Sequence, residues 1–141
     1  MKKIAVVYWS GTGNTERMAQ LIAEGAKANG AEAALVTAGD FSPDEINHFD
    51  AIAFGCPSMG EEELEETEFE PMFTAVEPSL KGKGIALFGS YGWGDGEWMR
   101  TWEDVCREDG ALLLCDSVIC QEEPDGAGEM ACRKMGETLA S

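Results

Sequence analysis

Three short segments of this chain of 141 residues combine glycines with hydroxyl, aromatic and acidic side chains. The first is Ser10-Gly11-Thr12-Gly13-Asn14-Thr15, and residues of helical spacing follow it. Glycines allow the backbone to turn tightly, and the free N–H groups at the start of a helix bind anions, phosphate above all. The first segment therefore predicts a phosphate site, with an ordinary capped helix start as the alternative.

The first segment lacks the features of two common phosphate-binding motifs. A P-loop requires a lysine, and the dinucleotide motif G-x-G-x-x-G requires a third glycine where Glu16 stands. No cation precedes Arg17 in this segment, whereas a triphosphate with magnesium needs a cation and a metal-binding carboxylate. A single phosphate monoester, held by N–H groups, hydroxyls and the helix dipole, is the expected ligand.

The second segment, Ser58 to Glu62, and the third, Ser90 to Gly94, offer contacts for a flat ring. Met59 is an adaptable apolar side chain, and Glu62 supplies a carboxylate that can accept a hydrogen bond from a ring N–H. Trp93 stands alone among glycines, which predicts a loop tip where its indole meets a ligand. The other tryptophans are interpreted as packing residues: Trp9 at a strand end, and Trp98 and Trp102 at helical spacing.

The elements that must position these segments are indicated by hydrophobic periodicity. Short apolar runs predict buried strands at Ile4–Trp9, Ala51–Gly55, Ile85–Gly89 and Leu112–Ile119, with an edge strand at Glu32–Thr37. Helical spacing connects Met18, Leu21, Ile22 and Gly25, then Trp98, Trp102 and Val105, and finally Met130, Lys134 and Met135. We predict a doubly wound α/β fold of five strands and five helices in three layers. Ligands of such folds bind at the carboxyl ends of the strands, where the three segments should meet.

Charge and composition narrow the function. Ten Lys and Arg residues against 27 Asp and Glu residues give a net charge of −17. This argues against nucleic acid and anionic membranes as partners, because both attract basic surfaces, and it favours a basic partner. With 44% hydrophobic residues, the chain has the composition of a globular protein, and its length fits one domain over residues 1–141.

Cysteine and histidine usage argues against several other sites. The five cysteines are odd in number and contain no C-x-x-C pair, and His48 is the one histidine, so we expect no zinc, iron–sulfur or other metal site and no disulfide framework. The cysteines are interpreted as small buried side chains in a reducing, cytoplasmic compartment. The apolar run after Lys2-Lys3 is too short for a signal peptide, and no run has transmembrane length.

In this order and at these spacings, the three segments resemble those of short-chain flavodoxins, and the resemblance extends to Pro124-Asp125 near the end of the chain. It implies a flavodoxin-like three-layer sandwich with a parallel sheet of order 2-1-3-4-5 and one non-covalently bound FMN. The residues expected around the FMN phosphate are Ser10, Gly11, Thr12, Gly13, Asn14 and Thr15. Pro57 departs from the pattern, because some relatives carry a hydroxyl residue there that helps to hold phosphate.

The resemblance also implies contacts for the flavin ring. Met59 and Trp93 would flank its two faces, Glu62 would accept a hydrogen bond from N3, and the backbone around Gly92 would donate to a pyrimidine oxygen. The remaining expected cofactor-binding positions are Ser58, Gly60, Ser90, Tyr91 and Gly94. A Met59-Gly60 peptide that turns its carbonyl toward N5 would need the conformational freedom of glycine.

The implied function is that of a low-potential one-electron carrier, without catalytic residues, that cycles between semiquinone and hydroquinone and shuttles electrons between redox enzymes. Seven glutamates stand within residues 61–70, either as a solvated entry to a helix or as a docking surface for basic partner oxidoreductases. We expect the carrier to be a monomer.

Three alternatives remain open at this stage. An FMN-dependent NAD(P)H or quinone oxidoreductase of the same fold would need room for a second planar substrate, which Trp93 is expected to cover. A phospho-accepting regulatory domain would need an aspartate after the third strand, where Gly55 stands. A carrier dedicated to activating one metalloenzyme is equally compatible with these residues.

Overall fold

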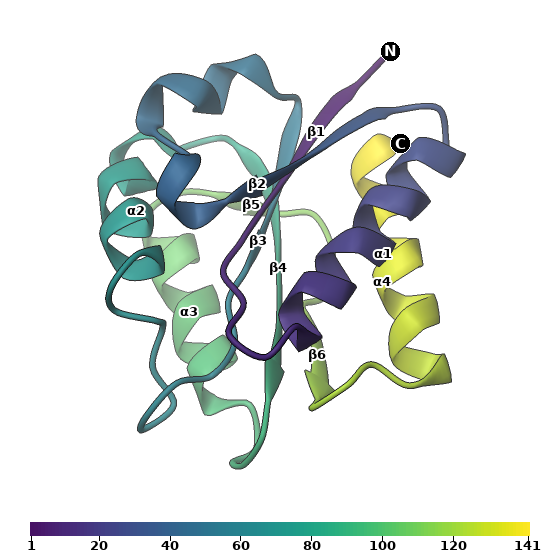
Figure 1. Cartoon of the computed structure of the whole chain (residues 1–141). Coiled ribbons are helices and arrows are strands. Elements are labelled where there is room, and N and C mark those ends of the chain that lie inside the picture. The colour runs from purple at the N-terminus through teal and green to yellow at the C-terminus, as the bar shows by residue number, and fades with distance from the viewer.

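The computed structural model describes all 141 residues and has one parallel sheet at its centre (Figure 1). The strands are β1 (Lys3–Tyr8), β2 (Glu32–Thr37), β3 (Ala51–Gly55), β4 (Gly84–Tyr91), β5 (Leu112–Leu113) and β6 (Val118–Gln121). They lie in the order β2-β1-β3-β4-β5, and β6 also pairs with β4. The predicted order 2-1-3-4-5 is confirmed.

The fifth position of the sheet is divided between two strands, although the sequence predicts one continuous strand over Leu112–Ile119. Leu113 pairs with Ile85, and the next pair joins Val118 to Phe88. Between these two pairs, β4 has two residues, 86–87, whereas the segment that joins β5 to β6 has four, residues 114–117. The longer segment therefore bulges out of the sheet. Its polar end is held outside the sheet, where the Ser117 hydroxyl donates to Glu103 at 2.6 Å.

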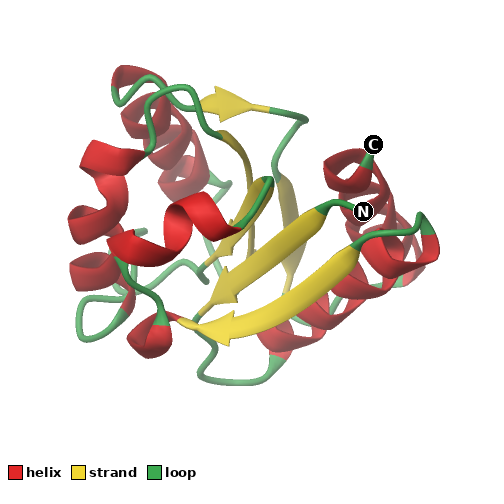
Figure 2. Cartoon of the chain, turned by 90° about the horizontal axis from the view of Figure 1, so that it is seen from above, coloured by secondary structure: helices red, strands yellow, loops and turns green.

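Four α-helices cover the two faces of the sheet, rather than the five helices predicted (Figures 1 and 2). Helices α1 (Asn14–Ala28) and α4 (Gly126–Ala140) lie side by side on one face, and α2 (Phe69–Val76) and α3 (Glu97–Glu108) lie on the other. The connection from β2 to β3 contains two short 3-10 segments, η1 (Ala38–Asp40) and η2 (Pro43–His48), and a third, η3 (Glu77–Ser79), follows α2.

Alternate side chains of the strands build two hydrophobic cores. Val7 and Phe54 face α2 and α3, whereas Val6 and Ala53 face α1 and α4. Trp98 and Trp102 are buried in the first core, as predicted. Four of the cysteines are buried and all five are free thiols.

The last helix, predicted from the spacing of Met130, Lys134 and Met135, is confirmed as α4, and Met130 is 72% exposed on it. The buried residues of α4 are Cys132, Met135, Gly136 and Leu139. These positions recur at helical spacing, and Met130, two residues before Cys132, lies on the opposite side of the helix. None of the helices is both long and apolar enough to cross a membrane.

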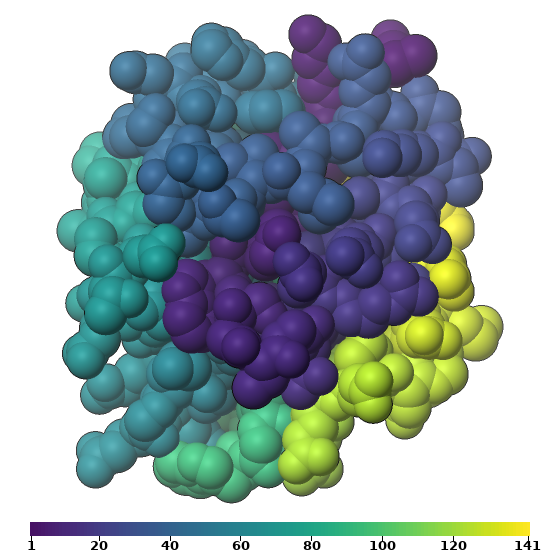
Figure 3. Space-filling view, viewed as in Figure 1, coloured from purple at the N-terminus to yellow at the C-terminus, as the bar shows by residue number.

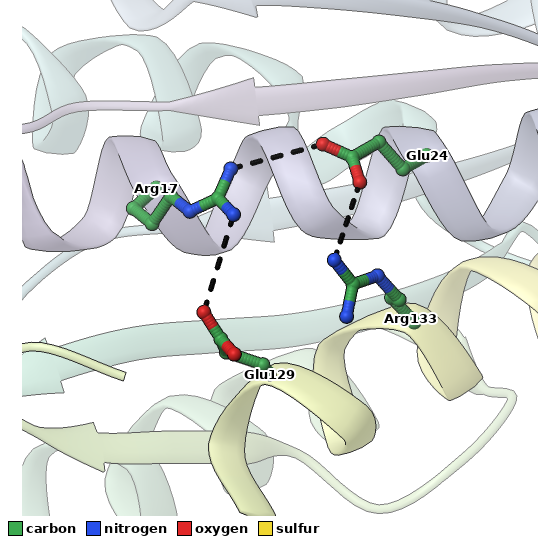
Figure 4. Close-up of polar contacts among 4 residues, drawn as sticks. All are labelled: Arg17, Glu24, Glu129 and Arg133. Carbon is green, nitrogen blue, oxygen red and sulfur yellow. Dashed lines mark hydrogen bonds and ion pairs between the residues drawn. The ribbon is translucent and has the colours of Figure 1, made fainter. Parts of the chain in front are cut away.

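Helices α1 and α4 approach each other through glycine. A Cβ atom at Gly25 would overlap the carbonyl oxygen of Arg133, and one at Gly136 would overlap that of Ile22. On the exposed side of this contact, Glu24 lies 3.5 Å from Arg133 and 3.7 Å from Arg17 (Figure 4). The close approach fixes α1, whose first residue belongs to the predicted phosphate loop.

Candidate functional site

A cavity of about 530 Å³ lies at the carboxyl ends of β1, β3 and β4, a size typical of small-molecule sites. In Figure 1 the loops that follow these strands gather at the lower end of the sheet. The chain crosses from β1 to β2 in one direction and from β3 to β4 in the other, so this is the point at which the strand order reverses. In Figure 3 the purple loop after β1 lies between the teal-blue and yellow-green loops of later segments.

Most of the predicted site residues line this cavity. They are Ser10, Gly11, Thr12, Asn14, Thr15, Ser58, Met59, Ser90, Tyr91 and Gly92. The other predicted positions lie outside its lining: Gly13, Gly60, Glu62, Trp93 and Gly94. Of these, Gly13 lines a second cavity of about 500 Å³ on the other side of the same loop.

Four lining residues were not assigned to the site from the sequence: Trp9, Pro57, Glu122 and Glu123. Trp9 could have been found, because it directly precedes the glycine-rich loop. Glu122 carries no local signal, because a contact with a distant segment places it in the site. Its N–H donates to the carbonyl oxygen of Tyr91 at 2.8 Å, which brings the loop before α4 to the cavity wall.

The loop after β1 carries backbone donors that the chain itself does not use. Gly13, with φ of 99°, precedes α1, and the Ser10 hydroxyl accepts hydrogen bonds from the N–H groups of Gly13 at 3.1 Å and Glu16 at 3.2 Å. The N–H groups of Gly11, Thr12, Asn14 and Thr15 donate to no atom of the chain. Free donors at the start of a helix of 15 residues make a site for an anion.

A buried pair of hydroxyls joins this loop to β4. Thr15 and Ser90 are almost fully buried, and their hydroxyl oxygens lie 2.8 Å apart. The N–H of Ser90 also donates to the Thr15 hydroxyl at 3.3 Å. These contacts close the floor of the cavity without placing a charge in it.

The loop after β3 forms a tight turn at the cavity rim. Met59 and Glu63 exchange two backbone hydrogen bonds of 2.8 Å, so residues 60–62 form the tip of the turn. Gly60 and Glu62 both have left-handed backbones, with φ of 52° and 58°. Met59 is 36% exposed and reaches the cavity, whereas Gly60 lies outside its lining.

Glu62 connects this turn to the loop after β4. Its Oε1 atom accepts a hydrogen bond from the N–H of Asp95 at 3.2 Å, and a Cβ atom at Gly94 would overlap the same oxygen. Its Oε2 atom is buried and has no hydrogen-bond partner. Trp93, on the same loop, is 62% exposed, as expected for a loop tip.

The charges around the cavity are negative. Its lining contains Glu122 and Glu123 but no lysine, arginine or histidine. The N–H groups of Gly92, Trp93 and Gly94 donate to no atom of the chain and are therefore free donors beside this acidic wall. The arrangement suits a ligand with an anionic group at the loop after β1 and a neutral ring toward the loops after β3 and β4.

Comparison with known proteins gives consistent matches. The family model described as Flavodoxin matches residues 6–136. The chain is 47% identical to flavodoxin from Megasphaera elsdenii over 97% of this chain and 98% of that protein, and 45% identical to flavodoxin from Clostridium beijerinckii over 96% and 98%. The solution structure of two-electron reduced Megasphaera elsdenii flavodoxin matches with a TM-score of 0.90 over 97% of this chain and 98% of that one. A flavodoxin structure from the domain Archaea matches at 28% identity with a TM-score of 0.83, over 98% and 96% of the two chains.

Proposed function

The chain belongs to the flavodoxin family, and we propose that the cavity at the carboxyl edge of its sheet holds the FMN with which this electron carrier works. The protein binds FMN and transfers electrons, and it is not an enzyme. The alternative of an NAD(P)H or quinone oxidoreductase is not favoured by these relatives. The proposal treats residues 1–141 as one FMN-binding domain.

The residues around the cavity fit FMN, which supplies the redox chemistry by taking up and releasing electrons. The unpaired N–H groups of Gly11, Thr12, Asn14 and Thr15 support the assignment of the phosphate to the loop after β1. This is the observation that carries the proposal, because the four residues with free donors line one cavity at a helix N-terminus, and no cation lines it. The hydroxyls of Ser10 and Thr12 complete the proposed phosphate site.

The proposed ring contacts come from the other two loops. Met59 and Trp93 stand on separate turns and are partly exposed, so both side chains are available to the ring. The buried, unpaired Oε2 atom of Glu62 is the proposed acceptor for flavin N3–H, and the free N–H groups of residues 92–94 are proposed donors to the pyrimidine oxygens. Ser58, Ser90 and Tyr91 complete the proposed cavity wall.

We propose that the acidic surroundings make this carrier strongly reducing. An extra electron on the cofactor would add negative charge beside Glu122 and Glu123, which line the cavity, and near Glu62, the proposed acceptor for N3–H, whereas no basic residue lines the cavity. One carboxylate at about 8 Å opposes such a charge by about 2 kcal/mol at an effective dielectric constant of about 20. A few carboxylates together would therefore lower the potential of the last reduction step substantially.

Flavodoxins transfer electrons to redox partners, and we propose that partners of this chain dock through basic surfaces. The exposed Glu61 and Glu63 belong to the turn that begins at Met59, and the exposed Glu66 lines a small pocket with Met59, which supports docking beside the flavin edge. We further propose a monomer in the cytoplasm, where five free thiols suit a reducing environment.

The test is a titration of FMN-free protein with FMN and, separately, with riboflavin, in which binding is measured by the quenching of flavin fluorescence. We expect one FMN per chain, and riboflavin, which lacks the phosphate, should bind about a hundredfold more weakly, since loss of two charge-assisted hydrogen bonds costs about 3 kcal/mol. The Trp93→Ala variant should bind FMN more weakly while keeping its free energy of unfolding, because the side chain is exposed. Equal affinity for FMN and riboflavin would contradict the phosphate site.

A further inference from the structure

Arg100 lies in the first turn of α3 and reaches back to the loop that carries Trp93. Its Nη1 atom donates to the carbonyl oxygen of Asp95 at 3.1 Å, and its Nη2 atom donates to Asp95 Oδ1 at 3.0 Å. One guanidinium thus holds both the backbone and the side chain of a single loop residue. A cation in the first turn opposes the helix dipole, so the helix itself does not favour arginine at this position.

The same loop residue holds Glu62. The Asp95 N–H donates to Glu62 Oε1 at 3.2 Å, and glycine at position 94 leaves room for that oxygen, because any Cβ atom would overlap it. Arg100, Asp95 and Glu62 therefore form one chain of contacts from α3 to the turn after β3. The hydrogen bond with Asp95 raises the pKa of Arg100, and the nearby Glu97 and Glu62 carboxylates raise it further.

We propose that Asp95 and Arg100 are positioning residues that hold Glu62 and the Trp93 loop in the arrangement that binds FMN. The inference rests on the proposed function, because Glu62 and Trp93 are proposed flavin contacts. With Oε1 engaged by the Asp95 N–H, Oε2 is left as the one free acceptor of this carboxylate.

Both proposed contacts need an external support. Glu62 has a left-handed backbone, with φ of 58°, which costs a residue with a Cβ atom about 1–2 kcal/mol. Trp93 lies between Gly92 and Gly94, and Gly96 follows in the same loop. Because glycine restricts the backbone little, this loop does not hold Trp93 in place by itself. Holding Asp95 restricts both segments before the ligand arrives, and preorganisation of this kind raises affinity.

The Arg100–Asp95 ion pair is exposed, with 59% and 81% of the two side chains accessible. Exposed ion pairs contribute little to global stability. The effect of losing it should therefore appear in the order of the loop and in FMN binding, and the free energy of unfolding should change little.

The test measures FMN binding by three variants: Arg100→Gln, Asp95→Asn and the double variant that carries both changes. Arg107→Gln is the control. The control removes a similar pair from the same helix, because Arg107 lies 3.3 Å from Asp104 and both are exposed. We expect each single variant at positions 100 and 95 to weaken FMN binding about three- to tenfold, and the control by less than about twofold. The double variant should be no weaker than Arg100→Gln alone, since both single variants remove the side-chain pair and Arg100→Gln also removes the hydrogen bond to the Asp95 carbonyl oxygen.

Three further readouts separate positioning from a general structural effect. In FMN-free protein, Arg100→Gln should shift the Asp95 backbone amide in the ¹H–¹⁵N spectrum and lower the fluorescence anisotropy of Trp93, measured in a chain in which the other tryptophans are phenylalanine. Arg100→Gln should also make the lower of the two midpoint potentials more negative, because it removes a positive charge near the cofactor. Arg100→Lys should restore this potential, which depends on charge, but not the anisotropy, which depends on the forked contact.

The proposal is overturned if Arg100→Gln and Arg107→Gln behave alike in FMN affinity, midpoint potentials and anisotropy, or if the effects of Arg100→Gln and Asp95→Asn add. Failure of the proposed function has a different signature. The wild-type chain would then not bind FMN, while the amide shift and the anisotropy of the FMN-free protein would still report whether Arg100 holds the loop.

Discussion

Glu65 differs from the glutamates on either side of it in the acidic run. It is 4% exposed, and its carboxylate accepts hydrogen bonds from the N–H groups of Thr67 and Glu68 at 2.8 Å and of Phe69 at 2.9 Å, as well as from the Thr67 hydroxyl. These donors lie at the start of α2, so Glu65 satisfies groups that the helix leaves unpaired. The exposed glutamates of the run are therefore available to partners, whereas Glu65 stabilises the start of α2.

Glu65→Gln should destabilise the protein in a pH-dependent way. Burial raises the pKa of Glu65, but hydrogen bonds from Thr67, Phe69 and Glu68 lower it more, so the net pKa lies below its usual 4.5. A depressed carboxylate pKa contributes stability that is present above the unfolded-state value and is lost as pH falls through the folded-state value. We expect the variant to lose about 1–3 kcal/mol at neutral pH, and the loss to shrink below about pH 4.5.

Urea unfolding of the wild type and Glu65→Gln at neutral and acidic pH measures this difference. Glu66→Gln is the matched control, because Glu66 is the exposed neighbour in the same run. It should change the free energy of unfolding by less than about 0.5 kcal/mol. A deficit of Glu65→Gln that stays constant across the acidic range would show that the charge of the carboxylate is not what stabilises α2.

At the scale of elements, the packing of α1 against α4 positions the phosphate loop. The two helices touch through Gly25 and Gly136, where backbone atoms of the partner helix occupy the space of a side chain. Because α1 begins at Asn14, any shift of α1 moves the free N–H groups of Asn14 and Thr15. The helix contact and the anion site are therefore mechanically connected.

Gly25→Ala should lower both stability and FMN affinity. The added methyl group meets the backbone of Arg133 rather than a mobile side chain, and overpacking of this kind costs about 1–3 kcal/mol. Thermal unfolding should show a clear decrease in Tm. Gly126→Ala is the control, because a Cβ atom at the first residue of α4 meets nothing within 4 Å, and it should be neutral or slightly stabilising. Equal Tm values for the two variants would mean that the helices separate without cost.

At the scale of the whole molecule, the net charge of −17 acts on every encounter. Electrostatic attraction accelerates association with a basic partner, and salt screens it over about 8–10 Å at physiological ionic strength. The exposed glutamates beside Met59 place part of this charge next to the proposed flavin edge. Steering should therefore be directional as well as strong.

Electron transfer from the reduced protein to a basic redox protein should slow by about tenfold or more between low and high ionic strength. Stopped-flow measurement of the bimolecular rate over a salt series tests this. Glu63→Gln with Glu66→Gln should lower the rate at low salt, whereas Glu137→Gln, an exposed position on α4, should change it little. A rate that does not depend on salt would rule out steering by the acidic surface.

The alternation of strands and helices, the burial of Trp98 and Trp102, and the glycine-rich loops at the strand ends could all be predicted from the amino-acid sequence. The resemblance to short-chain flavodoxins predicted the strand order. These features were accessible because apolar runs, helical spacing and turn residues report on contacts within a few positions of the chain. The same local signals missed the interruption of the predicted strand Leu112–Ile119, which the structure divides into β5 and β6, and they did not show that Met130 is exposed.

The roles of the individual acidic residues depend on the folded arrangement and could not be predicted from the sequence. Glu65 and Glu66 are adjacent and chemically identical, yet one caps α2 and the other is exposed. Glu62 meets the N–H of Asp95, and Glu122 joins the cavity wall through Tyr91. The contacts of Glu62 and Glu122 join segments about thirty residues apart, which meet only when the strands pair. Hydrophobic periodicity reports on neighbouring positions, so it cannot predict the partner of a side chain at such a distance.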